Sequence, residues 1–210
     1  MPSRALTRRD PLPGKNGFSA TRGFTLIELL VVVAVVAIIT TLALPSYRAI
    51  VEKRQVTSGA QQLAAFVSSA QLEAVKRNQR VAVRYDFTDI GDWCVGIVNE
   101  ESDGWDATEG CTCSSDPETN TCALDDTPRI MIPANLNYDE ALEAIVGADD
   151  SFYVIDPVRG MMEDFTDAVS FELVSRPEQN YALNVEVGPT GRIRICSNAG
   201  DQKVPGFEEC

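Results

Sequence analysis

A run of apolar residues near the beginning of the chain constrains its fold more than any other feature. Residues 24–44 hold a single charged side chain, Glu28, among 21 residues. The hydrocarbon core of a bilayer is about 30 Å thick, and a helix needs roughly 20 apolar residues to cross it. The run therefore predicts a membrane-spanning helix, and the 210-residue chain leaves room for one domain after it.

The charges before this run predict its direction. One acid, Asp10, and five bases precede Phe24; the bases are Arg4, Arg8, Arg9, Lys15 and Arg22. Positive flanks stay in the cytoplasm, so we expect the N-terminus inside and everything after Pro45 outside. The alternative is a secretory signal that is removed. Its apolar core is usually about 7–15 residues long, and TLALPSY matches its cleavage site poorly.

All the cysteines follow the apolar run, as in an exported domain: Cys94, Cys111, Cys113, Cys122, Cys196 and Cys210. Their even number indicates disulfides. We favour Cys196–Cys210, which would fasten the C-terminal tail. We do not expect Cys111 to pair with Cys113, because disulfide geometry is demanding. The pairing among the other four cysteines stays open. The chain has no histidine and no C-x-x-C, so we expect no metal site.

Glu28 needs an explanation, because a charged carboxylate at the centre of a membrane helix costs about 2.5 kcal/mol or more and usually has a partner. No basic residue follows it within the apolar run. One candidate partner is a new α-amino group on a neighbouring copy, formed if the chain is cut between Gly23 and Phe24. Alternatively, Glu28 lies close enough to the membrane surface to stay hydrated. The residues alone leave both explanations open.

Residues 22–47, RGFTLIELLVVVAVVAIITTLALPSY, resemble the N-terminal signal of type IV pilins and of type II secretion pseudopilins. The resemblance rests on Gly23, on the Phe-Thr-Leu-Ile-Glu that begins at Phe24, and on Pro45 after an apolar helix. It implies that a prepilin peptidase cuts after Gly23 and N-methylates Phe24. It also implies that Glu28 serves assembly by pairing with the Phe24 amine of a neighbouring pilin or pseudopilin subunit.

Beyond Pro45, which should kink or end the span, the helix is expected to continue to about Asn78. Apolar residues recur there in alternating steps of four and three, which predicts one buried stripe. The stripe consists of Val56, Ala60, Leu63, Val67, Ala70 and Ala74.

The rest of the chain alternates with a period of two, which is typical of half-buried strands. We expect strands at residues 81–87, 93–98, 151–156, 168–174, 181–187 and 192–196, the last two forming a hairpin. Residues 99–127 predict a long acidic loop tied down by disulfides, whose spacing fits no EF-hand calcium site. Residues 137–147 suggest a short helix. A long helix followed by an antiparallel sheet is an α+β arrangement.

Three stretches of the C-terminal half, FYVIDPVRG, FELVSR and YALNVEVGPTGRIRICSNAG, resemble the GspH/FimT group of minor pilins and pseudopilins. This implies the pilin fold, with a long N-terminal helix packed on an antiparallel β head of two small sheets. The chain then divides into a cleaved leader (1–23), a transmembrane and filament-core helix (24–45), the periplasmic half of the helix (46–78) and a β-rich head (79–210). The disulfide loop of the head (94–122) is an addition to the group's basic pattern.

Some FimT-type members bind DNA through Gly-Arg-x-Arg near the C-terminus, which Gly191, Arg192 and Arg194 match. Each guanidinium could clamp a phosphate, with Lys203 and Arg176 as further cations. The net charge argues for ordinary surface residues instead. The leader carries five bases and one acid, or +4, so its removal leaves −13 − 4 = −17, a charge that repels DNA.

We expect no enzyme and no cofactor, because the chain lacks histidine, a Walker loop and a G-x-G-x-x-G motif. Three hypotheses follow. The first is a minor pilin that is incorporated into, or primes, a type IV pilus, with double-stranded DNA as a further partner. The second is the H-type minor pseudopilin of a type II secretion system. The third is a membrane-anchored periplasmic binding domain without a filament role. In each, the protein crosses the inner membrane once.

Overall fold

The computed structural model describes residues 23–89, 92–114, 116, 118–136, 142–146, 152–164, 168–175, 181–200 and 202–210. The chain divides into two compact units, Met1–Leu44 and Pro45–Cys210. One helix, α1 (Leu26–Arg77), belongs to both units, and the strands all belong to the second. We refer to the second unit as the head and describe each unit by itself.

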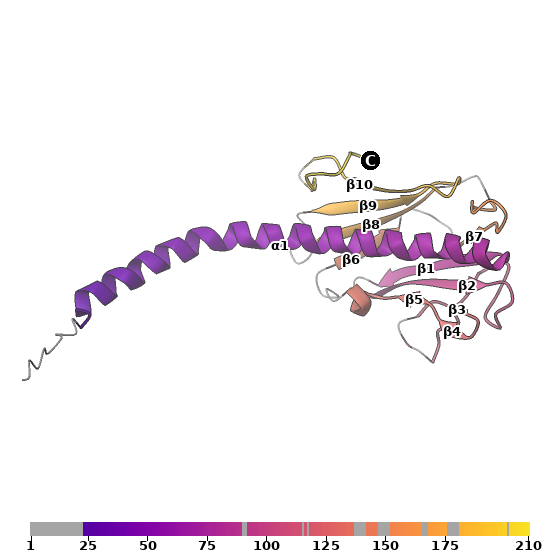
Figure 1. Ribbon diagram of the computed structural model, residues 1–210, viewed down its shortest axis with the longest axis horizontal. Coiled ribbons are helices and arrows are strands. Elements are labelled where there is room, and N and C mark those ends of the chain that lie inside the picture. Colours follow the sequence, from indigo (N-terminus) through magenta and orange to yellow (C-terminus); the bar gives the residue numbers. More distant parts are fainter. Residues whose placement is uncertain are drawn as a thin grey trace, which may run out of the picture. The chain divides into compact units, whose positions relative to one another are not determined.

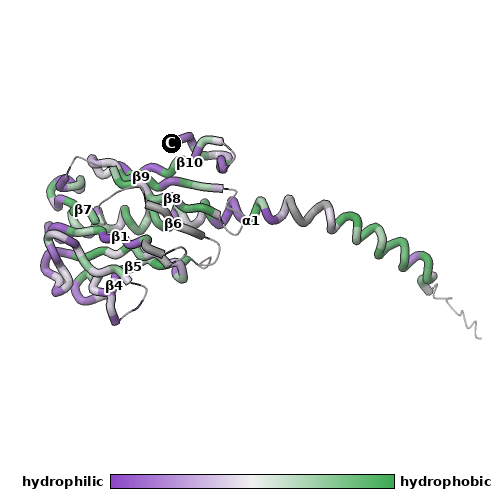
Figure 2. Tube along the Cα trace, turned by 180° about the vertical axis from the view of Figure 1, so that it is seen from behind, coloured by the Kyte–Doolittle hydropathy of each residue, from purple (hydrophilic) through white to green (hydrophobic). Residues whose placement is uncertain are grey.

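In the first unit, α1 is apolar along most of its length, with Glu28 as its one charged residue (Figure 2). Its large apolar side chains are exposed, from 49% at Val35 to 82% at Leu26. No single helix of the described residues has the length and composition to cross a membrane. Leu26–Thr41 and Ser46–Arg77 meet that requirement only together, as a bent pair.

In the head, α1 buries the stripe that the sequence predicted. Six side chains have no exposed surface there: Val56, Ala60, Leu63, Val67, Ala70 and Ala74. The helix ends at Arg77, where Asn78 takes a positive φ of 53°. The Asn78 N–H donates to the Val75 carbonyl and the Gln79 N–H to the Ala74 carbonyl, both at 3.3 Å. A left-handed residue directly after the last turn is a common way to cap a helix.

Two four-stranded antiparallel sheets accompany the helix. The first has the order β5-β2-β1-β7 and consists of β5 (Ile130–Met131), β2 (Asp92–Asn99), β1 (Val81–Asp89) and β7 (Phe152–Ile155). The second has the order β10-β9-β8-β6 and consists of β10 (Ile193–Ser197), β9 (Ala182–Val187), β8 (Val169–Ser175) and β6 (Leu142–Val146). The six strands expected from the sequence are confirmed, and so is the hairpin of β9 and β10.

The short helix expected over residues 137–147 is wrong. Leu142–Val146 is strand β6, which pairs with β8 from Leu142↔Ser175 to Val146↔Phe171. Residues 137–141 and 147 lie outside the described part of the chain. Helices this short are marginal unless tertiary packing holds them. Pairing with a sheet edge therefore decides the structure of this segment.

Residues 99–127, expected to be a loop, contain β3 (Ala123–Leu124) and the first residue of β4 (Thr127–Pro128), which pair with each other. A 3-10 helix, Pro133–Leu136, follows β5. The rest of the described loop is turns and irregular backbone, as expected.

The main core lies where α1 runs lengthwise between the two sheets (Figure 1). Aromatic rings join the sheets beside it: Tyr85 meets Phe171 edge to face with the ring centres 5.3 Å apart, and the Phe87 ring lies 6.0 Å from that of Phe171. Such ring pairs contribute roughly 0.5–1.5 kcal/mol beyond the area that they bury. The helix stripe is therefore shared by both sheets, and the head has one continuous core.

Leu63, at the middle of the stripe, should be essential for the stability of the head. We expect Leu63→Ala to lower the free energy of unfolding by about 2–5 kcal/mol, because it leaves a cavity between the sheets. Leu72→Ala on the same helix is the matched control, since Leu72 is 68% exposed, and it should change stability by less than about 0.5 kcal/mol. Urea denaturation of both variants measures this; equal losses would contradict the assignment of the core.

Candidate functional site

The N-terminus of α1 is an exposed, capped helix end. The Thr25 Oγ1 accepts a hydrogen bond from the Glu28 N–H at 3.3 Å, and the Leu29 N–H donates to the Thr25 carbonyl at 3.2 Å. Threonine followed three residues later by glutamate is the capping-box pattern. The sequence analysis did not predict this cap, although the spacing of Thr25 and Glu28 in TLIE could have revealed it. It places the Glu28 carboxylate in the first turn, where the helix dipole favours negative charge.

The bond between Gly23 and Phe24 is open to approach. A Cβ atom added at Gly23 would meet no atom of the described residues within 4 Å, and Phe24 is 81% exposed. Glu28 is exposed as well. Residues 1–22, which include the basic flank, lie outside the described part of the chain.

The sequence placed Gly191, Arg192 and Arg194 in a Gly-Arg-x-Arg motif at the β9–β10 turn. Gly191 has a φ of +79°, and an added side chain would overlap the carbonyl of Gly160. The Gln71 Nε2 donates to the Gly191 carbonyl at 2.7 Å. This glycine is therefore needed where the hairpin approaches α1, whatever the neighbouring arginines do.

Carboxylates hold two of the four cations proposed for DNA. Both the Nε and the Nη2 of Arg194 donate to the Glu186 Oε2, at 3.1 and 2.6 Å, from the adjacent strand position. The Lys203 ammonium donates to the Glu209 Oε1 at 2.6 Å, and this bond lowers the pKa of the Glu209 carboxyl. Among the described residues, Arg192 makes no ion pair and is exposed. Arg176 lies outside that part of the chain.

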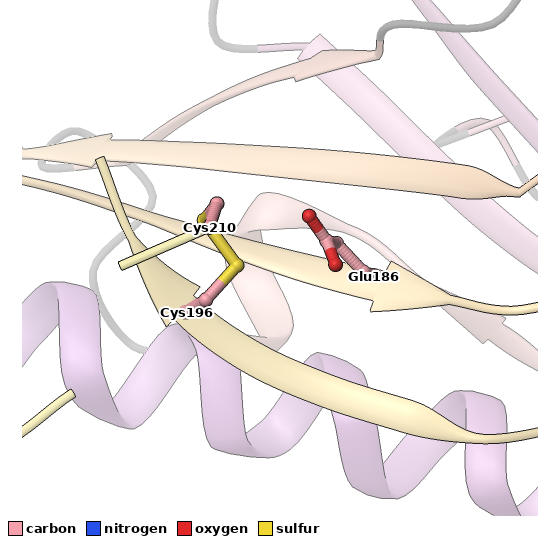
Figure 3. Close-up of side chains that lie close together, drawn as sticks. All are labelled: Glu186, Cys196 and Cys210. Carbon is pink, nitrogen blue, oxygen red and sulfur yellow. A yellow bond between two sulfur atoms is a disulfide. The ribbon is translucent and has the colours of Figure 1, made fainter. Parts of the chain in front are cut away.

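The disulfides connect Cys94 to Cys113, Cys111 to Cys122 and Cys196 to Cys210. The last is the pair that the sequence favoured, and it ties the C-terminus to β10. Glu186, Cys196 and Cys210 lie close enough to suggest metal ligands (Figure 3). However, both sulfurs belong to the disulfide, and Glu186 binds Arg194. This cluster therefore offers no thiolates to a metal.

The other two disulfides build a second, smaller core on the outer face of the first sheet. Its buried members are Ala82, Cys94, Val98, Cys111, Cys113 and Cys122. At Gly96 any larger side chain would overlap the Cys122 side chain. A glycine inside a strand often marks such a close approach, so VGIV was a usable signal that the sequence analysis missed.

The capped helix and the two-sheet head together define the pilin fold, and comparisons with known proteins identify the family. The Prokaryotic N-terminal methylation motif matches residues 18–44. The model of the Type II transport protein GspH family matches residues 59–204, most of the chain. The chain therefore belongs to the GspH family, as the sequence analysis expected.

Curated relatives match only the N-terminal region. A Type IV major alpha-pilin and a Fimbrial protein Q, both of Moraxella bovis, are each 45% identical over 47 residues. That stretch is 22% of this chain and 30% of each relative.

Solved structures align with more of the chain at low identity. The type IV minor pilin FimU of Pseudomonas aeruginosa aligns with a TM-score of 0.44 and 16% identity, over 75% of this chain and 98% of that one. The minor pseudopilin EpsH of Vibrio cholerae aligns with a TM-score of 0.45 and 12% identity, over 70% and 99%.

The chain is thus a pilin-like protein of the GspH family that carries the N-terminal methylation motif. Membership of this family implies an anchor in the inner membrane, processing by a prepilin peptidase and assembly with other pilin subunits. Proteins of this family are structural rather than enzymatic.

Proposed function

We propose that this protein is a minor pilin of a type IV pilus, anchored by the first half of α1 and then inserted into the filament through the same helix. The observation that carries the proposal is the apolar surface of the first unit, where the large side chains are half exposed or more. Apolar surfaces of this extent mark membrane or protein contacts. A subunit that moves from a bilayer into a filament core makes membrane contacts first and protein contacts afterwards.

Processing prepares this surface. We propose that cleavage after Gly23 creates the Phe24 amine, which is then methylated, and that the head lies in the periplasm. In the filament, the Glu28 carboxylate of one subunit pairs with the Phe24 amine of its neighbour. An ion pair is stronger in apolar surroundings than in water, and an unpaired carboxylate there is costly. The pairing therefore stabilises the one register in which the Glu28 carboxylate of an inserted subunit lies beside the Phe24 amine of its neighbour.

A second candidate is the H-type minor pseudopilin of a type II secretion system, which the description of the family model favours. Deletion in the native organism separates the two. Loss of surface pili with normal secretion supports the pilus, whereas retention of exoproteins in the periplasm with normal pili supports the secretion filament.

DNA binding stays outside the principal proposal, because Glu186 and Glu209 already hold Arg194 and Lys203. Among the cations that were proposed for DNA and that the structure describes, Arg192 alone is exposed and makes no ion pair. We expect the full chain to bind double-stranded DNA more weakly than about 10⁻⁴ M at physiological salt, the weak end of non-specific binding. Titration beside Arg192→Gln/Arg194→Gln and the exposed control Arg129→Gln measures this. Micromolar binding that only the double variant loses would establish a DNA receptor instead.

Replacing Glu28 tests the filament role. We expect Glu28→Ala and Glu28→Gln to remain in the membrane but to lower incorporation into filaments by about tenfold or more, because the unpaired amine and the lost carboxylate both disfavour insertion. Glu208→Gln, an exposed acid of the head, is the control. Quantification in membrane and filament fractions measures the effect. Normal incorporation of both Glu28 variants would contradict the proposed pairing of Glu28 with the Phe24 amine. Absence of the wild-type protein from filaments would favour the periplasmic binding domain.

A further inference from the structure

A groove of about 420 Å³ lies between α1 and the C-terminal tail. We call it the basic groove; it is lined by Lys53, Arg54, Thr57, Ser58 and Gln61 of α1 and by Val204 and Pro205 of the tail. The tail wall is held in place by the Cys196–Cys210 disulfide, and the Val204 N–H donates to the Ser197 Oγ at 2.8 Å. The groove therefore has two walls of fixed structure.

The cations of the basic groove have no carboxylate partner. Lys53 and Arg54 make no ion pair within the described chain, and neither does the exposed Arg48 before them. The Lys53 ammonium lies 4.8 Å from the centre of the Tyr181 ring, which orients it. The only acid on α1 between residues 46 and 72 is Glu52, which is 6% exposed and accepts a hydrogen bond from the Ser175 hydroxyl at 3.3 Å. All the charged side chains that are exposed on this helix segment are therefore cations, in a protein that is otherwise strongly acidic.

Hydroxyl and amide groups beside these cations suit a carboxylate. The Gln62 Nε2 donates to the Ser58 Oγ at 3.1 Å, which leaves the hydroxyl proton of Ser58 free to donate. Thr57 and Gln61 follow Lys53 at successive intervals of four residues, on the same face of the helix. Donors next to two cations are the usual arrangement for charge-assisted bonds to an anionic oxygen.

The complementary surface is the disulfide loop. Residues 100–126, which we call the acidic loop, contain nine acids and no base: Glu100, Glu101, Asp103, Asp106, Glu109, Asp116, Glu118, Asp125 and Asp126. Two of them pair within the chain, Glu100 with Arg80 and Asp125 with Arg77. Glu101 and Asp103 are exposed and make no ion pair within the described chain. The Cys94–Cys113 disulfide ties the loop to β2 of the first sheet, and the Cys111–Cys122 disulfide and the β3–β4 pair brace the loop internally.

The basic groove and the acidic loop lie at opposite corners of the head, so they do not meet within one copy (Figures 1 and 2). Two different surfaces that complement each other make a heterologous contact, which extends into an open helical series when the rotation does not close. We propose that the basic groove binds the acidic loop of a second copy of this chain, with Lys53 and Arg54 donating hydrogen bonds to its carboxylates. The inference rests on the filament role proposed above, because a filament is an open assembly that brings the two different surfaces of neighbouring copies together.

Carbodiimide cross-linking tests the contact, because it joins an amine to a carboxylate only where the two already touch. The full chain is purified in detergent micelles as an equal mixture of ¹⁴N- and ¹⁵N-labelled copies. We expect mixed-isotope cross-links between Lys53 and residues 100–126. They should fade between 0.1 and 1 M salt, as the screening length falls from about 10 Å to about 3 Å. The Lys203–Glu209 pair should link within single copies and serves as the positive control.

Charge reversal beside the Lys53 amine distinguishes cross-links that come from the proposed contact from those that come from random collisions. Arg54→Glu keeps Lys53 and should lower the mixed cross-links about tenfold, and Glu101→Lys/Asp103→Lys should do the same from the other side. Arg159→Glu, at an exposed arginine elsewhere on the head, should leave them unchanged. Cross-links from Lys53 only within one copy, to carboxylates outside residues 100–126, or to none would overturn the proposal. If incorporation into filaments still depends on Glu28, the loss of the groove proposal does not affect the proposed filament role.

Discussion

Burial of one face of α1 by two sheets is the interaction on which the head depends. Six side chains of the helix have no exposed surface, and the strands of both sheets pack against them. Small residues at Ala60, Ala70 and Ala74 let the strands approach the helix closely, and Leu63 and the valines fill the space between. Because this stripe begins at Val56, the head needs nothing from the first unit for its core. The first half of the helix is therefore available for the lipid and subunit contacts proposed above.

Periodicity was sufficient to predict most of this fold. The steps of four and three in α1 and the alternation in Tyr181–Val187 report directly which side chains are buried, so the helix stripe and the strands could be read from the sequence. Segment 142–146 could not, because strand β6 depends on pairing with β8, a partner distant in sequence. The pairing of Cys94 with Cys113 depends in the same way on how the loop folds back over the first sheet.

The candidate sites show a similar division. The TLIE cap and the TGRIR turn are local. The cap was missed although its spacing was visible in the sequence, and the turn lies where the sequence placed it. The ion pairs are not local in the same sense: Glu186 meets Arg194 across two strands, and Lys203 meets Glu209 because a disulfide folds the tail back. A motif of two arginines therefore reads as a cationic patch in the sequence, although one arginine is neutralised in the fold. The unpaired cations of Lys53 and Arg54 were equally hidden, because nothing in the sequence showed that Glu52 is buried.

In the proposed function, the first unit becomes a filament-core helix only after its leader is removed and the new N-terminus is methylated. The most direct test is the intact mass, with the N-terminal peptide, of the protein extracted from membranes of the organism that makes it. The account requires a chain that begins at Phe24 and carries one added methyl group. A chain that still contains residues 1–23, or one cut on the far side of the apolar run after Leu44, would contradict it.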